Sequence, residues 1–370
     1  MFFFSFLYSQ FFVTPALPDH DFSNQTIIIT GSNSGLGFEA AKQFLALHCF
    51  KLIIAVRSTS KGEAAKQSLL ETNPHISASQ IEVWPLNLSS FKSVRAFADR
   101  ASSELERVDA LVENAGLDGG RFVLSEDGWE STLQINVIST CLLAVLMLPK
   151  LRQTAERFKG TPHLVLVTSD THYWARFEER NAEGGILRAL NDEEKFNSSD
   201  RYAPHFLLAE GKFRFPALQS QLKLTFHPPL RYATTKLLQI LFIREFARRL
   251  KSSPSASYRP ILTLPTPGLC HTPFFGQMKP PENAVSHPLG TVTHYAMKGM
   301  LIALSRRADV GARTIVTAAC AGKEADGAFM MDGQVREVVG WVLTEEGRRV
   351  QEKVFREILA AAGVKEGDLV

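Results

Sequence analysis

The stretch Ile27–Gly37, which reads Ile-Ile-Ile-Thr-Gly-Ser-Asn-Ser-Gly-Leu-Gly, decides the fold of this chain. Three consecutive isoleucines predict a buried strand, and the glycines that follow predict a tight turn that opens a helix. At such a turn the backbone can approach a pyrophosphate without interference from a Cβ, and the helix N-terminus supplies N–H donors. The stretch therefore predicts a dinucleotide site at Gly31, Gly35 and Gly37, in a turn that also contains Ser32 and Leu36.

Apolar runs of strand length alternate with amphipathic stretches of helix length from residue 26 onward. We expect strands at Thr26–Thr30, Lys51–Val56, Gln80–Leu86, Ala110–Val112, His163–Thr168 and Pro260–Leu264. We expect helices at Gly35–Leu47, Ser60–Glu71, Ser90–Glu104 and Trp129–Arg157, and a helical tail from Leu343 to Ala362. This alternation predicts an α/β fold with a single doubly wound parallel sheet, whose strand C-termini form the ligand-binding edge.

Composition narrows the class of protein. The chain has 370 residues, is 45% hydrophobic and carries a formal net charge of +3, which predicts a large domain with a full core and no nucleic-acid partner. No Cys-x-x-Cys motif occurs, so we expect buried, reduced thiols of a cytoplasmic protein and no metal site. The four cysteines are Cys49, Cys141, Cys270 and Cys320.

The N-terminal segment, residues 1–21, differs from the domain expected over residues 22–370. Residues 2–13 are almost wholly apolar and aromatic, and the first charged side chain is Asp19. The run is shorter than the about 20 residues that span a bilayer, and it lacks the basic region and cleavage site of a secretory signal. Two interpretations stay open: the segment packs on the domain or a partner subunit, or it makes a weak monotopic membrane contact.

A Tyr and a Lys four positions apart, Tyr232 and Lys236, would lie on one face of a helix, about 5–6 Å apart at Cβ. This pair, the T-G-x-x-x-G-x-G pattern from Thr30 and Asn114-Ala115-Gly116 together resemble the short-chain dehydrogenase/reductase family. The retinol-dehydrogenase-like and fungal secondary-metabolism branches are the most similar. The resemblance spans about residues 22–360. It implies a Rossmann fold with substrate-loop insertions, and a nicotinamide-dependent oxidoreductase.

Four catalytic roles follow from that resemblance. Tyr232 would protonate the substrate carbonyl oxygen, and the Lys236 cation would lower the pKa of the phenol. Ser169, at the end of the fifth strand, would hydrogen-bond the substrate oxygen. Asn136 would hold a water that links Lys236 to solvent.

The cofactor expected from the second strand is NADP(H). That strand ends at Arg57, where NAD enzymes place a carboxylate for the ribose 2′-hydroxyl, and a guanidinium suits a 2′-phosphate. The simpler interpretation of Arg57 is a solvated surface arginine. By resemblance, Ser32 would also bind the phosphate, and the remaining cofactor contacts would come from Asn87, Asn114, Tyr232, Lys236 and Thr272.

One segment breaks the family pattern. Ser169 and Tyr232 are 63 positions apart, and the tripeptide Arg-Tyr-Ala occurs at both 201–203 and 231–233. Deleting 202–231 would leave a continuous, family-like helix start. Two hypotheses stay open for the insert at about 203–231: a translated intron left in the gene model, or a genuine substrate lid.

The substrate is expected to be a lipophilic ketone or aldehyde and its alcohol. Phe274, Phe275 and Met278 predict an apolar pocket, and His172, Tyr173 and Trp174 would line it. Two alternatives remain: a catalytically inactive NADP-binding scaffold, and a membrane-associated retinoid or lipid dehydrogenase. The resemblance also implies homo-oligomers that pair through the helices at 129–157 and 232–250.

Overall fold

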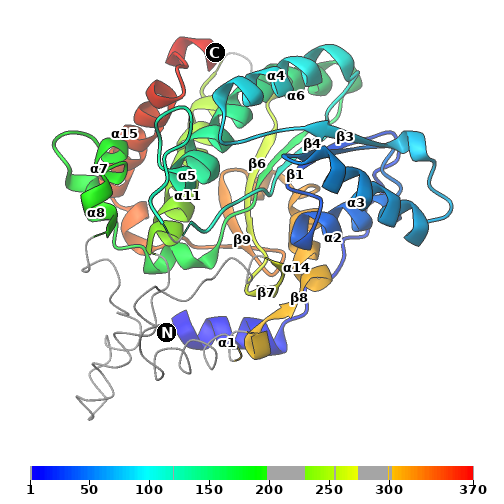
Figure 1. Ribbon diagram of the computed structural model, residues 1–370, viewed down its shortest axis with the longest axis horizontal. Coiled ribbons are helices and arrows are strands. Elements are labelled where there is room, and N and C mark those ends of the chain that lie inside the picture. The colour runs from blue at the N-terminus through cyan, green and yellow to red at the C-terminus, as the bar shows by residue number, and fades with distance from the viewer. Residues whose placement is uncertain are drawn as a thin grey trace.

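An eight-stranded sheet forms the centre of the protein (Figure 1), in the order β10-β9-β6-β5-β4-β1-β2-β3. The computed structural model describes residues 2–119, 121–197, 230–253, 256–273, 299 and 302–369. The strands are β1 (Thr26–Thr30), β2 (Lys51–Val56), β3 (Ile81–Pro85), β4 (Ala110–Glu113), β5 (His163–Leu166), β6 (Ile261–Thr266), β9 (Ala328–Met331) and β10 (Gln334–Arg336). This order is that of a doubly wound Rossmann sheet and confirms the predicted fold class.

The sheet is parallel except at one edge. All neighbouring pairs from β3 to β9 run parallel, but β10 pairs with β9 antiparallel. Asp332 and Gly333 join these two strands with positive φ values of 54° and 76°. Two such residues in a two-residue loop are typical of the hairpin turn that matches strand twist. This antiparallel edge strand was not predicted from the sequence.

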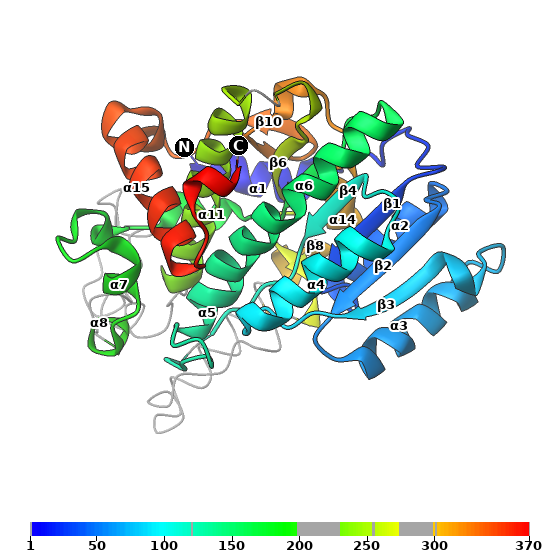
Figure 2. The ribbon, with the colours of Figure 1, turned by 90° about the horizontal axis from the view of Figure 1, so that it is seen from above.

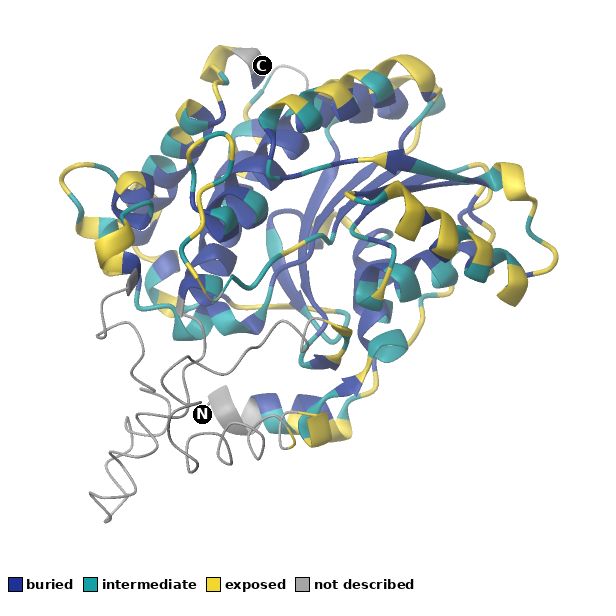
Figure 3. Cartoon of the chain, in the orientation of Figure 1, coloured by how far each residue is buried: buried dark blue, intermediate teal, exposed yellow. Residues whose placement is uncertain are grey.

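Helices cover both faces of the sheet (Figure 2). On one face lie α2 (Gly35–Ala46), α3 (Thr59–Thr72) and α14 (Ala308–Ala318), which contribute buried side chains to one hydrophobic cluster with Ile27 and Ile29 of β1. On the other face lie α4 (Phe91–Glu104), α6 (Thr140–Phe158), α11 (Leu230–Lys251) and α15 (Glu345–Ala361). Figure 3 shows the strands buried between the two helical layers.

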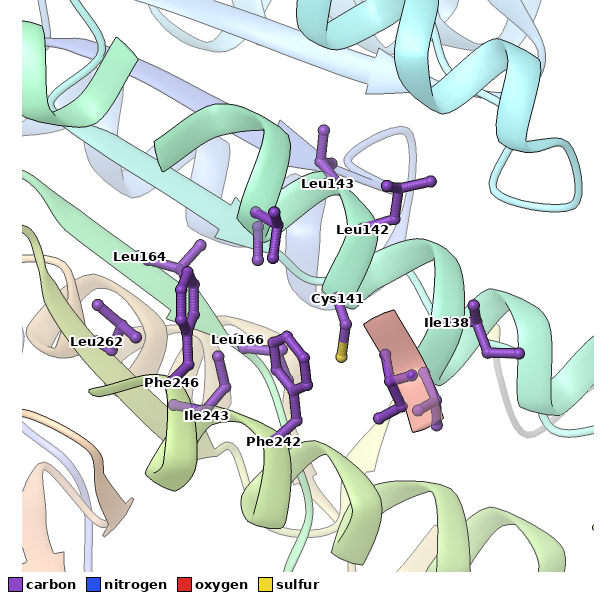
Figure 4. Close-up of a cluster of buried hydrophobic side chains, with 14 of the residues drawn as sticks. Ile138, Cys141, Leu142, Leu143, Leu164, Leu166, Phe242, Ile243, Phe246 and Leu262 are labelled. Atoms are coloured by element: carbon purple, nitrogen blue, oxygen red, sulfur yellow. The ribbon is translucent and has the colours of Figure 1, made fainter. Parts of the chain in front are cut away.

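The core beside the candidate site is built by α6 and α11. Figure 4 shows Phe242 and Phe246 of α11 beside Leu164 and Leu166 of β5, with Cys141 of α6 near them. Nearly every described side chain of α11 is buried within this one chain, which includes its packing against α15. The expected oligomer interface through α11 is therefore covered by the chain itself.

The predicted helix at Trp129–Arg157 is interrupted. It comprises a short helical turn, α5 (Ser131–Leu133), a π-helical segment, η2 (Gln134–Ser139), and then α6. Ser131–Phe158 is the one stretch in the described part of the chain that is long and apolar enough to cross a membrane, and 83% of its most apolar window is buried. Such burial is typical of a core helix.

The N-terminal segment forms a helix, α1 (Phe2–Phe12), that docks on the domain, which confirms the first of its two interpretations. The predicted pocket residues Phe274, Phe275 and Met278 lie outside the described residues. So does the insert at 203–231, apart from Leu230 and Arg231. All four cysteines are free; Cys49, Cys141 and Cys270 are buried as predicted, whereas Cys320 is partly exposed.

Candidate functional site

The glycine-rich turn packs so closely on the end of β4 that side chains are excluded from it. Gly31 and Gly35 have φ values of 65° and 59°, which favour glycine. A Cβ on Gly31 would lie 2.9 Å from the Ala115 Cα, and one on Gly37 would lie 2.5 Å from Asn114 Nδ2. The turn therefore leaves bare backbone ahead of α2, which is the surface a pyrophosphate requires.

Asn114 and Thr272 both adjoin this turn. The Asn114 backbone N–H donates to Thr30 Oγ1 at 3.0 Å, and its side-chain Nδ2 donates to the Thr30 carbonyl at 3.0 Å. Thr272 comes from the far end of the sequence, yet a Cβ on Gly35 would lie 3.3 Å from the Thr272 Cβ. The fold thus brings Thr272 beside the turn, as the resemblance implies.

The residues expected at the adenosine end are less closely grouped. Arg57 is exposed and has no hydrogen bond or ion pair within the residues described here. Ser32 is fully buried, and its Oγ donates to the Ile29 carbonyl at 2.8 Å, so its hydroxyl does not face the surface with Arg57. The Asn87 carboxamide oxygen already accepts from the Ser89 hydroxyl at 2.7 Å. Of Arg57, Ser32 and Asn87, only Arg57 is exposed, and its guanidinium donors have no partner among the described residues.

Tyr232 and Lys236 lie one turn apart on α11 and face the end of β5. The Lys236 Nζ donates to the Val167 carbonyl at 2.9 Å and lies 5.3 Å from the Tyr232 ring centroid. Lys236 is only 4% exposed, and burial lowers its pKa to about 7. Lys236 makes no carboxylate ion pair with any residue that the structure describes, so a single carbonyl solvates its ammonium group.

The expected lowering of the Tyr232 pKa is wrong for the protein groups alone. Burial raises the pKa of this phenol, and the nearby carboxylates of Asp118 and Asp170 raise it further. A neutral phenol is the form that can donate a proton. The phenol is therefore held in its acid form.

Ser169 begins the short helical segment η3 (Asp170–Trp174) directly after β5. Its Oγ donates to Asp170 Oδ1 at 3.2 Å and accepts from the Thr171 N–H at 3.2 Å. Asp170 is buried, and burial raises its pKa to about 6. The Ser169 hydroxyl is thus held at the carboxyl edge of the sheet, where the resemblance places it.

His172 is held against the backbone of Ser169. It is fully buried, its Nδ1 lies 2.8 Å from the Ser169 carbonyl, and its ring centroid lies 4.0 Å from that of Tyr173, with the two rings tilted by 34°. Burial lowers the pKa of His172 to about 4, so the ring is neutral and Nδ1 donates. The role of His172 in lining the substrate pocket stays a prediction, because the other residues expected there, such as Phe274 and Phe275, lie outside the described residues.

Asn136 lies in the π-helical segment η2 and has its polar groups engaged. Its Oδ1 accepts from the Leu117 N–H at 2.8 Å, and its Nδ2 donates to the Leu117 carbonyl at 2.8 Å and to Thr235 Oγ1 at 3.2 Å. The Asn136 carbonyl accepts from Gln239 Nε2 at 2.7 Å. Asn136 thereby links the segment after β4 to α11, one residue from Lys236.

Two residues of this region were not predicted. Gln239 follows Lys236 by three positions on α11, a spacing that places both on one face and could have identified it. Asp118 follows the Asn-Ala-Gly motif, and burial raises its pKa to about 7. Gln239 donates to the Asn136 carbonyl and so belongs to its polar network, whereas Asp118 follows Leu117, the residue that Asn136 binds.

Arg231 precedes the catalytic pair and is anchored to α5. Its Nε lies 3.3 Å from the buried Glu130 carboxylate. An arginine precedes the tyrosine in both copies of the tripeptide, at Arg201 and Arg231, so this contact is compatible with either origin of the insert. Across the described ranges, no three or more His, Cys, Asp and Glu residues are grouped as metal ligands.

Comparison with known proteins agrees with this geometry. Residues 25–171 match the family model of short chain dehydrogenases. A short chain dehydrogenase/reductase of Cryptosporiopsis sp. is 32% identical over 355 residues, covering 96% of this chain and 95% of the relative. A short-chain dehydrogenase of Penicillium roqueforti is 34% identical over 358 residues, covering 96% and 82%.

Solved structures share the fold. An NADPH-bound carbonyl reductase from chicken fatty liver superposes with a TM-score of 0.54 at 14% identity, covering 86% of this chain and 100% of that one. A protein from Mycobacterium paratuberculosis gives a TM-score of 0.57 at 24% identity, covering 94% and 96%. The glycine turn, the Tyr232–Lys236 helix and the full-length relatives together show that the chain is an oxidoreductase of the short-chain dehydrogenase/reductase family.

Proposed function

We propose that this protein is an NADP(H)-dependent oxidoreductase that interconverts a lipophilic ketone or aldehyde and its alcohol, with residues 22–370 as one catalytic domain. The observation that carries the proposal is the buried Lys236, whose ammonium group lies by the Tyr232 ring without a carboxylate partner. A buried, unpaired lysine costs stability, so its presence beside a phenol supports a chemical role.

Each catalytic side chain has one task in this scheme. Tyr232 gives its phenolic proton to the substrate oxygen, and the Ser169 hydroxyl donates a hydrogen bond to that oxygen as negative charge develops. Lys236 then stabilises the phenolate that remains. Asn136 holds the segment after β4 against α11 and keeps this group aligned; its expected water would carry the replacement proton.

The residues of the glycine turn fit a dinucleotide, because the turn offers bare backbone and Arg57 offers unpaired donors at the end of β2. The nicotinamide cofactor supplies the hydride. Gly31, Gly35 and Gly37 would bind the pyrophosphate, Asn87 the adenine and Thr272 the nicotinamide carboxamide. Arg57 would bind the 2′-phosphate, which favours NADP(H) over NAD(H).

The cofactor preference is tested by titration. NADPH and NADH are added separately to the wild type and to Arg57→Ala, with binding followed by the change in nicotinamide fluorescence. We expect the variant to lose about tenfold in NADPH affinity and little in NADH affinity. Arg121, in the loop after β4, serves as a matched control when changed to Ala. Equal NADPH binding by the wild type and Arg57→Ala would contradict the assignment.

The substrate class is tested with a ketone and aldehyde panel that includes hydrophobic secondary metabolites, the setting we propose for this enzyme. We expect kcat/KM to rise with the apolar area of the substrate. The panel is run on the full chain and on a version without 202–231. Turnover by the full chain would support a genuine lid, and turnover by the shortened chain alone would support a translated intron. Tight NADPH binding without any turnover would favour the scaffold alternative.

We also propose that the protein is cytoplasmic and makes weak membrane contact through α1. Tyr8, Phe11 and Phe12 are exposed on that helix, and exposed aromatic clusters favour a bilayer surface. Sedimentation with neutral phospholipid vesicles tests this contact. Changing all three aromatics to Ser should abolish co-sedimentation, and unchanged binding would exclude the helix. Light scattering tests the homo-oligomer formation that we propose.

A further inference from the structure

The N-terminal helix α1 is attached to the domain by its polar residues. Ser9 and Gln10 are buried together with Phe6, whereas Tyr8, Phe11 and Phe12 are exposed. A surface helix of a globular protein normally buries its apolar face. On α1 the side that faces the domain is partly polar, so the hydrogen bonds of Ser9 and Gln10 fix its position in addition to the apolar contact of Phe6.

The Gln10 carboxamide binds the backbone on both sides of residues 274–298. Its Oε1 accepts from the Leu269 N–H at 3.2 Å, and its Nε2 donates to the Leu269 carbonyl at 2.9 Å. The same Nε2 donates to the Leu304 carbonyl at 3.1 Å. One side chain therefore ties together the segments that lead into and out of that stretch.

Arg306 reinforces this attachment. Its guanidinium donates to Asp332 Oδ1 at 2.9 Å and to the Ser9 carbonyl at 2.8 Å, and the Ser9 hydroxyl donates to Asp332 Oδ2 at 2.6 Å. The side chains of Arg306 and Asp332 are 5% and 6% exposed. The Arg306 N–H also donates to the Leu269 carbonyl at 2.9 Å. The α1 helix, the β9–β10 hairpin and the start of β7 (Cys270–His271) thus share one buried polar cluster.

The turn that this cluster holds is Pro267–Thr272, directly after β6. A Cβ on Gly268 would lie 2.5 Å from Gln10 Oε1, so the turn and the glutamine are in direct contact. Thr272 ends the same turn and packs beside Gly35 of the glycine-rich loop. A shift of Leu269 would therefore move Thr272 relative to the glycine turn.

We propose that Gln10 is a positioning residue for the cofactor site: it fixes the Pro267–Thr272 turn, and through Thr272 the nicotinamide end of the site. The inference rests on the proposed function, because it assigns α1 to the same reaction. It gives a functional role to α1, a helix that precedes the first strand and lies outside the domain at residues 22–370.

Gln10→Glu and Gln10→Ala test this role. The Glu variant keeps the shape but places a carboxylate oxygen against the Leu269 and Leu304 carbonyls, and the Ala variant removes all three hydrogen bonds. We expect Kd and KM for NADPH to rise about tenfold in both variants, with a smaller change in kcat. Hydrogen exchange at residues 268–272 should accelerate. Gln67→Glu, an exposed glutamine on α3, is the matched control.

The outcomes separate the two proposals. A fall in thermal stability of the Gln10 variants with unchanged NADPH Kd and KM would overturn the positioning role while leaving the proposed function intact. Failure of the wild-type chain to bind any nicotinamide nucleotide would overturn the proposed function, and this inference with it.

Discussion

Two buried cations lie close to the carboxyl edge of the sheet in opposite surroundings. Arg306 is 8% exposed and is neutralised by Asp332 and capped by Ser9. Lys236 is 4% exposed, has one carbonyl partner, and burial lowers its pKa to about 7. A paired charge joins elements of the fold, whereas an unpaired one remains able to act on a neighbouring proton. At this edge of the sheet, Arg306 therefore has a structural role and Lys236 is placed for a chemical one.

Removing the phenol beside Lys236 should have the largest effect. Tyr232→Phe deletes the group that donates the proton, and general acid catalysis is worth about 10²–10⁴-fold. We expect kcat to fall by that factor while NADPH affinity stays within about twofold. Tyr258→Phe, which changes an exposed tyrosine outside α11, is the control. Retained turnover in Tyr232→Phe would show that the proton donor is not the phenol beside Lys236.

Breaking the paired cation should unfold the protein more readily. Arg306→Met leaves the Asp332 carboxylate buried without its partner, which costs about 3–5 kcal/mol. Urea unfolding measures the loss. Arg307→Met, at the neighbouring residue whose side chain is 83% exposed, should leave the free energy of unfolding nearly unchanged. A similarly small effect of Arg306→Met would remove the distinction between the two cations.

Removing the unpaired Lys236 cation should raise the free energy of unfolding, whereas removing Arg306 should lower it. Burial lowers the pKa of Lys236 to about 7, so above that pH the unfolded chain holds more protons than the folded one, and stability rises with pH. Lys236→Met abolishes this dependence and should be inactive yet more stable than the wild type. The gain should be greatest at pH 7 and below and should shrink toward about pH 10.

The control for Lys236→Met is Lys92→Met, on the exposed side of α4. Chemical unfolding at several pH values gives the comparison. A stability gain that does not vary with pH would show that Lys236 is already paired.

The smallest effect concerns a buried acid in β4. Both Glu113 carboxyl oxygens lack hydrogen-bond partners in the described structure, and burial raises the pKa of this group well above its usual range. The folded chain therefore keeps a proton that the unfolded chain releases above about pH 4.3, and stability falls as pH rises.

Glu113→Gln removes this titration and should raise the melting temperature at pH 8 by about 2 °C, with little change at pH 5. Scanning calorimetry at the two pH values measures the difference, with Glu63→Gln on exposed α3 as the control. A larger gain at pH 5 than at pH 8 would reverse the assigned pKa direction.

The local sequence pattern predicted best the first strands of the sheet, which lie beside the glycine-rich turn. The apolar runs at Thr26–Thr30 and Lys51–Val56 became β1 and β2 with the same bounds, because parallel central strands are continuous apolar runs. The β9–β10 hairpin was missed, although Asp332-Gly333 after the apolar run Ala328–Met331 is a readable hairpin signal.

Features that depend on tertiary contact could not be predicted. The composition of α1 is mostly apolar, yet the helix docks on the domain through the polar side chains of Ser9 and Gln10. Their partners lie more than 250 positions away in the sequence, so no local pattern could identify them. The burial that raises the Tyr232 pKa and encloses His172 is likewise set by packing between distant elements. The Tyr232–Lys236 spacing located the helix face but not the environment around it.

The most direct test of the account is NADPH oxidation by the full chain over the hydrophobic carbonyl panel, with the wild type and Tyr232→Phe measured side by side. The account predicts carbonyl-dependent oxidation by the wild type and its loss in Tyr232→Phe at equal NADPH saturation. Equal rates in the two proteins, or no oxidation of NADPH or NADH with any carbonyl, would contradict it.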